Sequence, residues 1–150
     1  MKSLFCMFCT LAIASSVSAQ ETGNAMLKYG LNFLKTPYVA HTLEVNEEEK
    51  LVVNFDEVDC TTFVEYVLAL SLSPVKNGAI DKTDYARVLQ KIRYRDGRIN
   101  GYTSRLHYIA DWINNGVKHG FMEDVTAANS PDSIALSRCD CPLLLIKHTF

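Results

Sequence analysis

The spacing of apolar residues predicts four helices, because apolar positions recur three and four residues apart. We expect helices over residues 22–34, from near Asp59, after Asp81, and over residues 104–117. Asp81 is the expected N-cap of the third helix, with Asp84 in its first turn. The inward positions are Met26, Leu27, Gly30, Leu31 and Leu34; Cys60, Phe63, Val64, Val67, Leu68 and Ser71; Tyr85, Val88, Leu89 and Ile92; and Leu106, Ile109, Ala110, Ile113 and Val117.

Strand patterns are fewer than helical ones. Residues 42–45 and 51–55 predict a hairpin, and the acidic stretch 46–49 is its expected turn. The apolar run 143–146 is open to two interpretations, a buried strand or a tail outside the domain. The predicted fold class is therefore α+β, with N-terminal helices packed on a small antiparallel sheet that is incomplete.

The first nineteen residues have the pattern of a secretory signal peptide. Lys2 precedes an apolar stretch at 4–14, and Val17-Ser18-Ala19 places small residues before the expected cleavage point. We therefore expect export to the periplasm or the extracellular space. The predicted domain covers residues 20–136, and residues 137–150 form an atypical tail without a clear period.

Length and charge exclude several classes of protein. A chain of 150 residues with 48% hydrophobic and 21% charged residues is one globular domain. The net charge of −2 lacks the positive footprint of a nucleic-acid-binding protein. No apolar run reaches the 18 or more residues of a membrane span. After the signal peptide only Cys60, Cys139 and Cys141 remain, too few for a disulfide scaffold.

Cys60 is the main candidate for chemistry. It stands in the first turn of a predicted helix, where the partial positive charge of the helix N-terminus stabilises a thiolate. The thiolate is the nucleophilic form of cysteine. The alternative is structural, because a single cysteine on an apolar helix face is commonly a small buried hydrophobe.

Two short motifs resemble those of a known superfamily. Residues 36–39 (Thr-Pro-Tyr-Val) and 59–64 (Asp-Cys-Thr-Thr-Phe-Val) resemble the T-P-Y-x-W-G-G and D-C-S-G-[FL]-V motifs of the NlpC superfamily of bacterial cell-wall cysteine peptidases. Residues 56–70 and 93–112 resemble one branch more closely, the N-acetylmuramoyl-L-alanine amidase-like family. The sequence differs by Ala40-His41-Thr42 in place of the glycine pair, and by Thr61-Thr62 in place of Ser-Gly.

The resemblance implies a fold, a reaction and a partner. It implies a papain-like fold and hydrolysis of the amide between N-acetylmuramic acid and L-alanine in peptidoglycan or muropeptide fragments. Cys60 would attack the carbonyl, and Tyr38 would lie beside it. No metal ion or cofactor would be needed.

The sequence leaves the identity of the general base open. The superfamily's catalytic histidine follows the cysteine on a later strand, and no such motif occurs after residue 120, so we expect a domain cut short at its C-terminus. His107 is the best base within the chain, with Asp111 four residues later to orient it. The resemblance favours a substrate groove for the same segment, formed by Arg105, Tyr108, Asp111 and Trp112.

Two other functions are considered, a non-catalytic role and a zinc site. The chain could be an inactive truncated fragment or a module that binds cell-wall fragments without cleaving them. Cys139, Cys141 and His148 suggest zinc, but one-residue spacing between the cysteines and the lack of a fourth ligand argue against a metal site.

Overall fold

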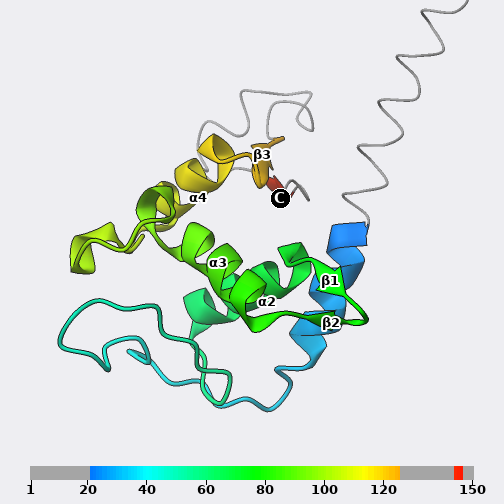
Figure 1. Ribbon diagram of the computed structural model, residues 1–150, viewed down its shortest axis with the longest axis horizontal. Helices are drawn as coiled ribbons and strands as arrows, with labels where there is room; N and C mark the ends of the chain where they lie inside the picture. Colours follow the sequence, from blue (N-terminus) through cyan, green and yellow to red (C-terminus); the bar gives the residue numbers. More distant parts are fainter. Residues whose placement is uncertain (1–20, 126–143, 147–150) are drawn as a thin grey trace, which may run out of the picture.

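The computed structural model describes residues 21–125 and 144–146, shown in colour in Figure 1. A helix over residues 21–31 is followed by α2 (Cys60–Leu72), α3 (Lys82–Arg93) and α4 (Ile109–Lys118). The strands are β1 (Val75–Lys76), β2 (Ala79–Ile80), β3 (Met122–Asp124) and β4 (Leu144–Ile146), and the short 3-10 turns are η1 (Arg95–Gly97) and η2 (Tyr102–Ser104). The predicted signal peptide, Cys139, Cys141 and His148 lie outside the described residues.

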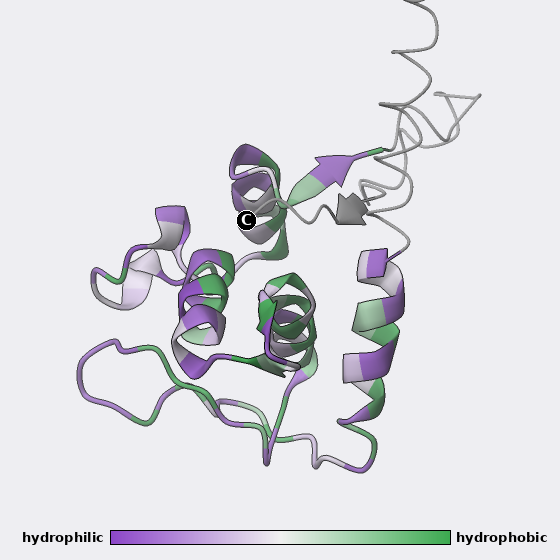
Figure 2. Cartoon of the chain, turned by 45° about the vertical axis from the view of Figure 1, so that its right-hand side comes forward, coloured by the Kyte–Doolittle hydropathy of each residue, from purple (hydrophilic) through white to green (hydrophobic). Residues whose placement is uncertain are grey.

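α2 is the central helix of the structure. Figure 2 shows it between the helix at residues 21–31 and α3, with apolar residues around most of its circumference. Leu68, Ala69 and Leu72 are fully buried. A helix that is apolar on nearly every side must be covered on nearly every side, and these neighbours provide that cover.

α3 follows its prediction closely. Asp81 caps the helix by accepting hydrogen bonds from Thr83 N (2.8 Å) and Asp84 N (3.2 Å). One face of the helix is buried against α2 and the other is polar, as Figure 2 shows. The buried residues include the predicted set, Tyr85, Val88, Leu89 and Ile92.

The inward faces of the other helices differ from their predictions. In the first helical segment Leu27, Leu31 and Leu34 are exposed, whereas Met26 packs on the core as predicted, together with Phe33. In α2, Cys60 and Val64 are exposed, because the contacts with α3 and with residues 52–54 fall on the face of Glu65 and Tyr66. α4 begins at Ile109 rather than near residue 104, and it buries Trp112, Asn115 and Gly116 while Ile109, Ala110 and Val117 are exposed.

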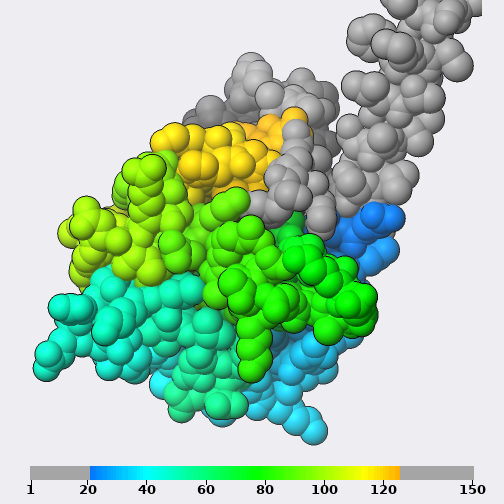
Figure 3. Space-filling model, viewed as in Figure 1, coloured from blue at the N-terminus to red at the C-terminus, as the bar shows by residue number. Residues whose placement is uncertain are grey.

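The predicted hairpin over residues 42–55 does not form. Neither of its strands is paired, and the segment follows an irregular path. The residues on either side of the segment are joined by one parallel bridge between Tyr38 and Val58, in which Val39 N donates to Val58 O (3.0 Å) and Val58 N donates to Pro37 O (3.1 Å). In Figure 3 the cyan to blue-green residues of this segment form the lower edge of the visible face, beside the yellow-green residues of the η1 and η2 region.

The fold class is nevertheless mixed helix and small antiparallel sheet. β1 and β2 form a two-stranded hairpin that the sequence analysis missed, with Asn77 and Gly78 both at positive φ as a two-residue turn requires. β3 pairs with β4 in antiparallel register, Met122 opposite Ile146. The apolar run at the end of the chain thus contributes a strand at residues 144–146. In the described part of the chain no helix is long and apolar enough to cross a membrane.

Candidate functional site at the start of α2

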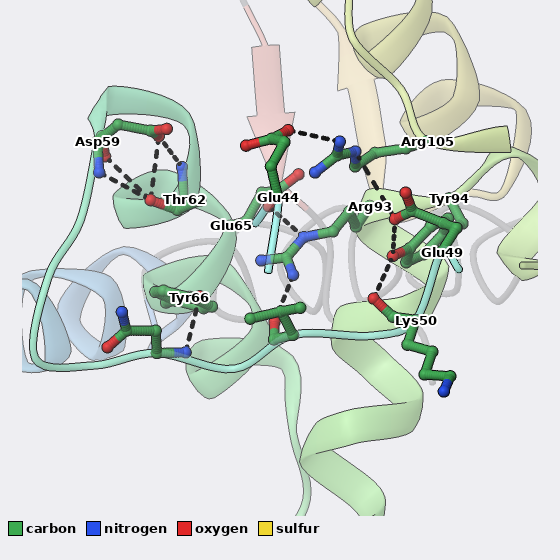
Figure 4. A network of polar contacts seen from close by, with 12 residues as sticks. Glu44, Glu49, Lys50, Asp59, Thr62, Glu65, Tyr66, Arg93, Tyr94 and Arg105 are labelled. Carbon is green, nitrogen blue, oxygen red and sulfur yellow. Dashed lines mark hydrogen bonds and ion pairs between the residues drawn. The ribbon is translucent and has the colours of Figure 1, made fainter. Parts of the chain in front are cut away.

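The first turn of α2 is fixed by a reciprocal capping box (Figure 4). Thr62 N donates to Asp59 Oδ1 (2.7 Å), and Asp59 N donates to Thr62 Oγ1 (2.8 Å). Phe63 N donates to Asp59 O (3.0 Å) in the normal helical pattern. The N–H groups of Cys60 and Thr61 have no acceptor among the described residues, so two donors remain open beside the thiol.

Cys60 is exposed and its thiol is free. Its sulfur lies 3.9 Å from Thr61 Oγ1. Exposure contradicts the prediction of an inward-facing cysteine, and it also removes the structural interpretation of Cys60 as a buried hydrophobe. A thiol with two open N–H groups beside it is suited to attack on a carbonyl and to stabilise the resulting oxyanion.

A cavity of about 220 Å³ opens at Cys60. Three separate segments form its wall: residues 38–44, the start of α2, and residues 105–107. Tyr38 is brought there by the bridge between Tyr38 and Val58. Of the residues predicted from sequence, the cavity contains Cys60, Tyr38, Arg105 and His107, and its full lining is Tyr38, Ala40, His41, Leu43, Glu44, Asp59, Cys60, Thr61, Thr62, Glu65, Arg105, Leu106 and His107.

His107 lies in the cavity wall, but its predicted pairing with Asp111 is wrong. The two residues do not share a helix, because Leu106 N donates to Arg93 O (3.0 Å) and holds the segment before α4 extended. His107 Nε2 lies 3.0 Å from Tyr102 O, and the His107 ring packs on the Tyr102 ring with centroids 4.2 Å apart. A carbonyl oxygen only accepts, so Nε2 carries the proton and Nδ1 of the neutral ring is a free acceptor.

The other predicted groove residues are separated. Tyr108 is exposed, Asp111 pairs with Arg95 at 3.3 Å, and Trp112 is buried. None of the three lines the Cys60 cavity. The predicted continuous polar and aromatic helix face was wrong, because residues 105–108 precede the helix on which Asp111 and Trp112 stand.

Arg105 is 6% exposed and connects two cavities. Its Nη2 donates to Glu44 Oε1 (2.6 Å), its Nε lies 3.7 Å from Glu49 Oε1, and its guanidinium stands 5.0 Å from the Tyr102 ring centroid. The second cavity measures about 490 Å³ and shares Leu43, Glu44 and Arg105 with the first. The Glu44–Arg105 ion pair therefore stands between them.

A buried ion pair behind the site was missed by the sequence analysis. Glu65, on α2, is 2% exposed and Arg93, at the end of α3, is 1% exposed. Arg93 Nε donates to Glu65 Oε2 at 2.7 Å (Figure 4). Burial raises the pKa of Glu65, with Arg93 acting in the opposite direction. The available signal was a single carboxylate inside the apolar stretch of a central helix, which is rarely buried without a partner.

Within residues 21–125 and 144–146 no group of three or more His, Cys, Asp or Glu side chains could hold a metal ion. The site offers a thiol, an imidazole, a phenol, a buried carboxylate and an arginine. These groups suit acyl transfer through a covalent intermediate.

Comparison with known proteins gives one family. The model of the AmiA-like family, described as N-acetylmuramoyl-L-alanine amidase-like, matches residues 28–140. No curated protein gives a significant match.

Several solved structures are similar to the chain. An N-acetylmuramoyl-L-alanine amidase from Bacteroides uniformis is 65% identical with a TM-score of 0.68, over 71% of this chain and 46% of that one. A Bacteroides fragilis protein provisionally named a xylanase is 63% identical with a TM-score of 0.66, over 70% and 45% of the two chains. A Legionella pneumophila protein at 24% identity, with a TM-score of 0.60 over 83% and 39%, shares the fold. The chain spans less than half the length of these relatives.

Proposed function

Because the chain belongs to the N-acetylmuramoyl-L-alanine amidase-like family, we propose that it is exported and hydrolyses the amide between N-acetylmuramic acid and L-alanine in peptidoglycan or muropeptide fragments. The observation that carries this proposal is the exposed Cys60 thiol at the capped start of α2, inside a cavity shared with Tyr38 and His107. The proposed overall plan is papain-like, with the nucleophile at the start of a central helix.

The first step is attack of Cys60 Sγ on the amide carbonyl. The carbon–sulfur bond forms while the carbonyl oxygen takes up negative charge. The N–H groups of Cys60 and Thr61 are the donors for this oxyanion, since Asp59 already binds Thr62 N. Fixed backbone donors of this kind stabilise the transition state without reorganisation.

His107 is the proposed base. Its Nδ1 is the acceptor nitrogen once Nε2 donates to Tyr102 O. It takes the thiol proton and returns a proton to the leaving nitrogen as the carbon–nitrogen bond breaks. Water then cleaves the thioester, which releases the muramic acid and restores the thiol. Here the Tyr102 carbonyl orients the imidazole in place of the predicted Asp111.

Tyr38 and Arg105 are the proposed substrate-binding groups. Tyr38 is mostly exposed on the rim of the cavity, where its hydroxyl can donate to the substrate. Arg105 lies at the junction of the two cavities and presents a cation to carboxyl groups of the peptide stem. Its ion pair with Glu44 must rearrange when a ligand carboxylate takes its place.

Digestion of N-acetylmuramoyl-L-alanine by the purified protein tests the proposal. Mass spectrometry should detect free L-alanine with the unaltered protein and none above background with Cys60→Ala. His107→Gln should lower turnover by about 10²-fold or more, the usual contribution of a general base. Tyr108→Phe is the matched control, since Tyr108 lies outside the cavity.

Two results would contradict the proposal. One is release of alanine that Cys60→Ala leaves unchanged. The other is a folded protein that binds the muropeptide without cleaving it, which would identify a binding module.

A further inference from the structure

Glu65 is a buried carboxylate that the proposed reaction does not use, yet it lines the Cys60 cavity. It stands five residues after Cys60 on the same helix, about 7.5 Å further along the axis at 1.5 Å per residue. Side chains of a helix tilt toward its N-terminus, so the carboxylate reaches back toward the first turn, although it projects from the helix about 140° away from Cys60.

The contact with Arg93 uses only part of each group. Arg93 Nε donates to Glu65 Oε2, while the buried Arg93 Nη2 has no hydrogen-bond partner among the described residues. The pair is therefore joined by one hydrogen bond rather than by the two parallel bonds of a bidentate arginine–carboxylate pair. Glu65 Oε1 accepts no hydrogen bond from the described residues, and Glu65 is part of the cavity wall.

Arg93 is held so that it cannot easily turn to use the second oxygen. Its Nη1 donates to Val52 O (2.6 Å), and its guanidinium lies 5.3 Å from the Tyr66 ring centroid. Stability alone is a weak reason for such an arrangement, because apolar residues commonly replace a buried ion pair without loss. A rigidly held acceptor in the wall of the nucleophile's cavity is instead suited to ligand recognition.

We propose that Glu65 is a specificity-determining residue, whose free carboxylate oxygen accepts a hydrogen bond from an N–H donor on the peptide side of the substrate. The proposal rests on the proposed function. The donor is the N–H one peptide unit beyond the amide that Cys60 attacks, because it is the first N–H of the peptide stem that the proposed reaction does not use. The nitrogen of the attacked amide stays free to receive its proton.

Two ligands that differ by one methyl group test this assignment. N-acetylmuramoyl-L-alanine methylamide carries the N–H, and the dimethylamide lacks it. Binding is measured with Cys60→Ala, so that no turnover occurs. We expect this protein to bind the methylamide about tenfold more tightly, in line with a hydrogen bond to a charged group.

Glu65→Gln should remove that preference. The glutamine has one acceptor oxygen, which Arg93 takes, so its NH₂ group faces the cavity and cannot accept. Glu57→Gln is the matched control, since Glu57 does not line the cavity, and it should keep the preference. Survival of the tenfold preference in Glu65→Gln overturns the proposal.

A second variant keeps the test valid if Glu65→Gln fails to fold. Glu65→Leu combined with Arg93→Met removes both charges together and leaves none buried alone. It should also lose the preference for the methylamide. A preference retained by this folded double variant overturns the proposal as well.

Failure of the proposed function would look different: it appears as absent turnover in the digestion assay, and the binding comparison still decides on Glu65 unless neither ligand binds. In that case the charge of Glu65 is probed through the reactivity of Cys60 in protein that keeps this thiol. Two methanethiosulfonate reagents are compared, one with an ammonium group and one with a sulfonate. Modification is followed on the proteolytic peptide that contains Cys60. Glu65→Gln should lower the ratio of ammonium to sulfonate reactivity, and Glu57→Gln should not. An unchanged ratio in Glu65→Gln overturns the proposal.

Discussion

The helix pair α2 and α3 and the segment over residues 36–58 are built in contrasting ways. The helices hold their own backbone hydrogen bonds and pack through apolar side chains such as Leu72 and Leu89. The segment has almost no backbone pairing of its own beyond the Tyr38–Val58 bridge. Its backbone is held by side chains of the helix pair and of the residue that follows α3.

Three such side chains reach the segment (Figure 4). The Tyr66 hydroxyl accepts from Asn54 N at 3.0 Å, and Arg93 donates to Val52 O. The Tyr94 hydroxyl donates to Glu49 Oε1 at 2.6 Å and lies 3.1 Å from Lys50 O. The site therefore depends on both kinds of construction, since one wall of the cavity comes from each region.

Arg93→Ala should have the largest effect, because Arg93 serves both regions. The substitution leaves the Glu65 carboxylate buried without its partner and frees Val52 O. We expect a loss of about 3–5 kcal/mol in the free energy of unfolding, measured by urea denaturation. Arg87→Ala, on the exposed side of α3, is the control. A loss below about 1 kcal/mol would show that the pair is not integral to the core.

Leu89→Ala should act on the helix pair alone. Leu89 is fully buried between the helices, and truncation of such a residue costs about 2–5 kcal/mol. Limited proteolysis under native conditions should find residues 41–55 no more accessible than before. Leu31→Ala, at an exposed site, should stay within about 0.5 kcal/mol of the unaltered protein. Faster cleavage in 41–55 would mean that the two regions are not separable.

Tyr66→Phe should act mainly on the segment. It removes one hydroxyl and leaves Asn54 N without an acceptor, at a cost of about 1 kcal/mol. We expect faster proteolysis near residues 51–56, with the helical circular dichroism unchanged. Tyr108→Phe is the matched control at an exposed position. Equal protection in the two variants would contradict the anchoring role of Tyr66.

The smallest effect concerns the cap of α3. The pKa of Asp81 lies below its usual value, because the N–H groups of Asp84 and Thr83 donate to its carboxylate. A carboxyl group with a lowered pKa in the folded protein stabilises the fold when the pH is above its pKa in the unfolded chain, about 4. This contribution disappears as the pH falls through the lower pKa of the folded protein.

Asp81→Asn keeps a capping oxygen that does not titrate. The difference in urea midpoint between this variant and the unaltered protein should be constant above about pH 5 and should change as the pH falls below about 4. A difference that stays constant down to pH 2.5 would contradict the cap assignment.

The sequence predicted α3 well because its signals are local. A cap at Asp81 and a stripe of apolar residues at helical spacing need no distant partner. The hairpin prediction at 42–55 was wrong because alternation of apolar residues describes an extended chain, without saying what satisfies its backbone. Here the partners lie far along the sequence, such as Arg93 for Val52 O.

The site was predictable in its members but not in its geometry. The motifs around Tyr38 and Cys60 and the choice of His107 selected three residues that line one cavity. The orientation of His107 depends on the contact between Leu106 N and Arg93 O, which helical periodicity does not encode. Glu65 was hidden because it stands among apolar residues of α2 that the pattern assigns to the core.

Trapping of the covalent intermediate is the decisive test of Cys60 as the nucleophile. The protein is mixed with N-acetylmuramoyl-L-alanine, quenched in acid, digested and analysed by mass spectrometry of the peptide that contains Cys60. We expect an N-acetylmuramoyl thioester on Cys60, and no adduct on the corresponding peptide of Cys60→Ala. Release of alanine without any adduct on that peptide, and undiminished in Cys60→Ala, would contradict it.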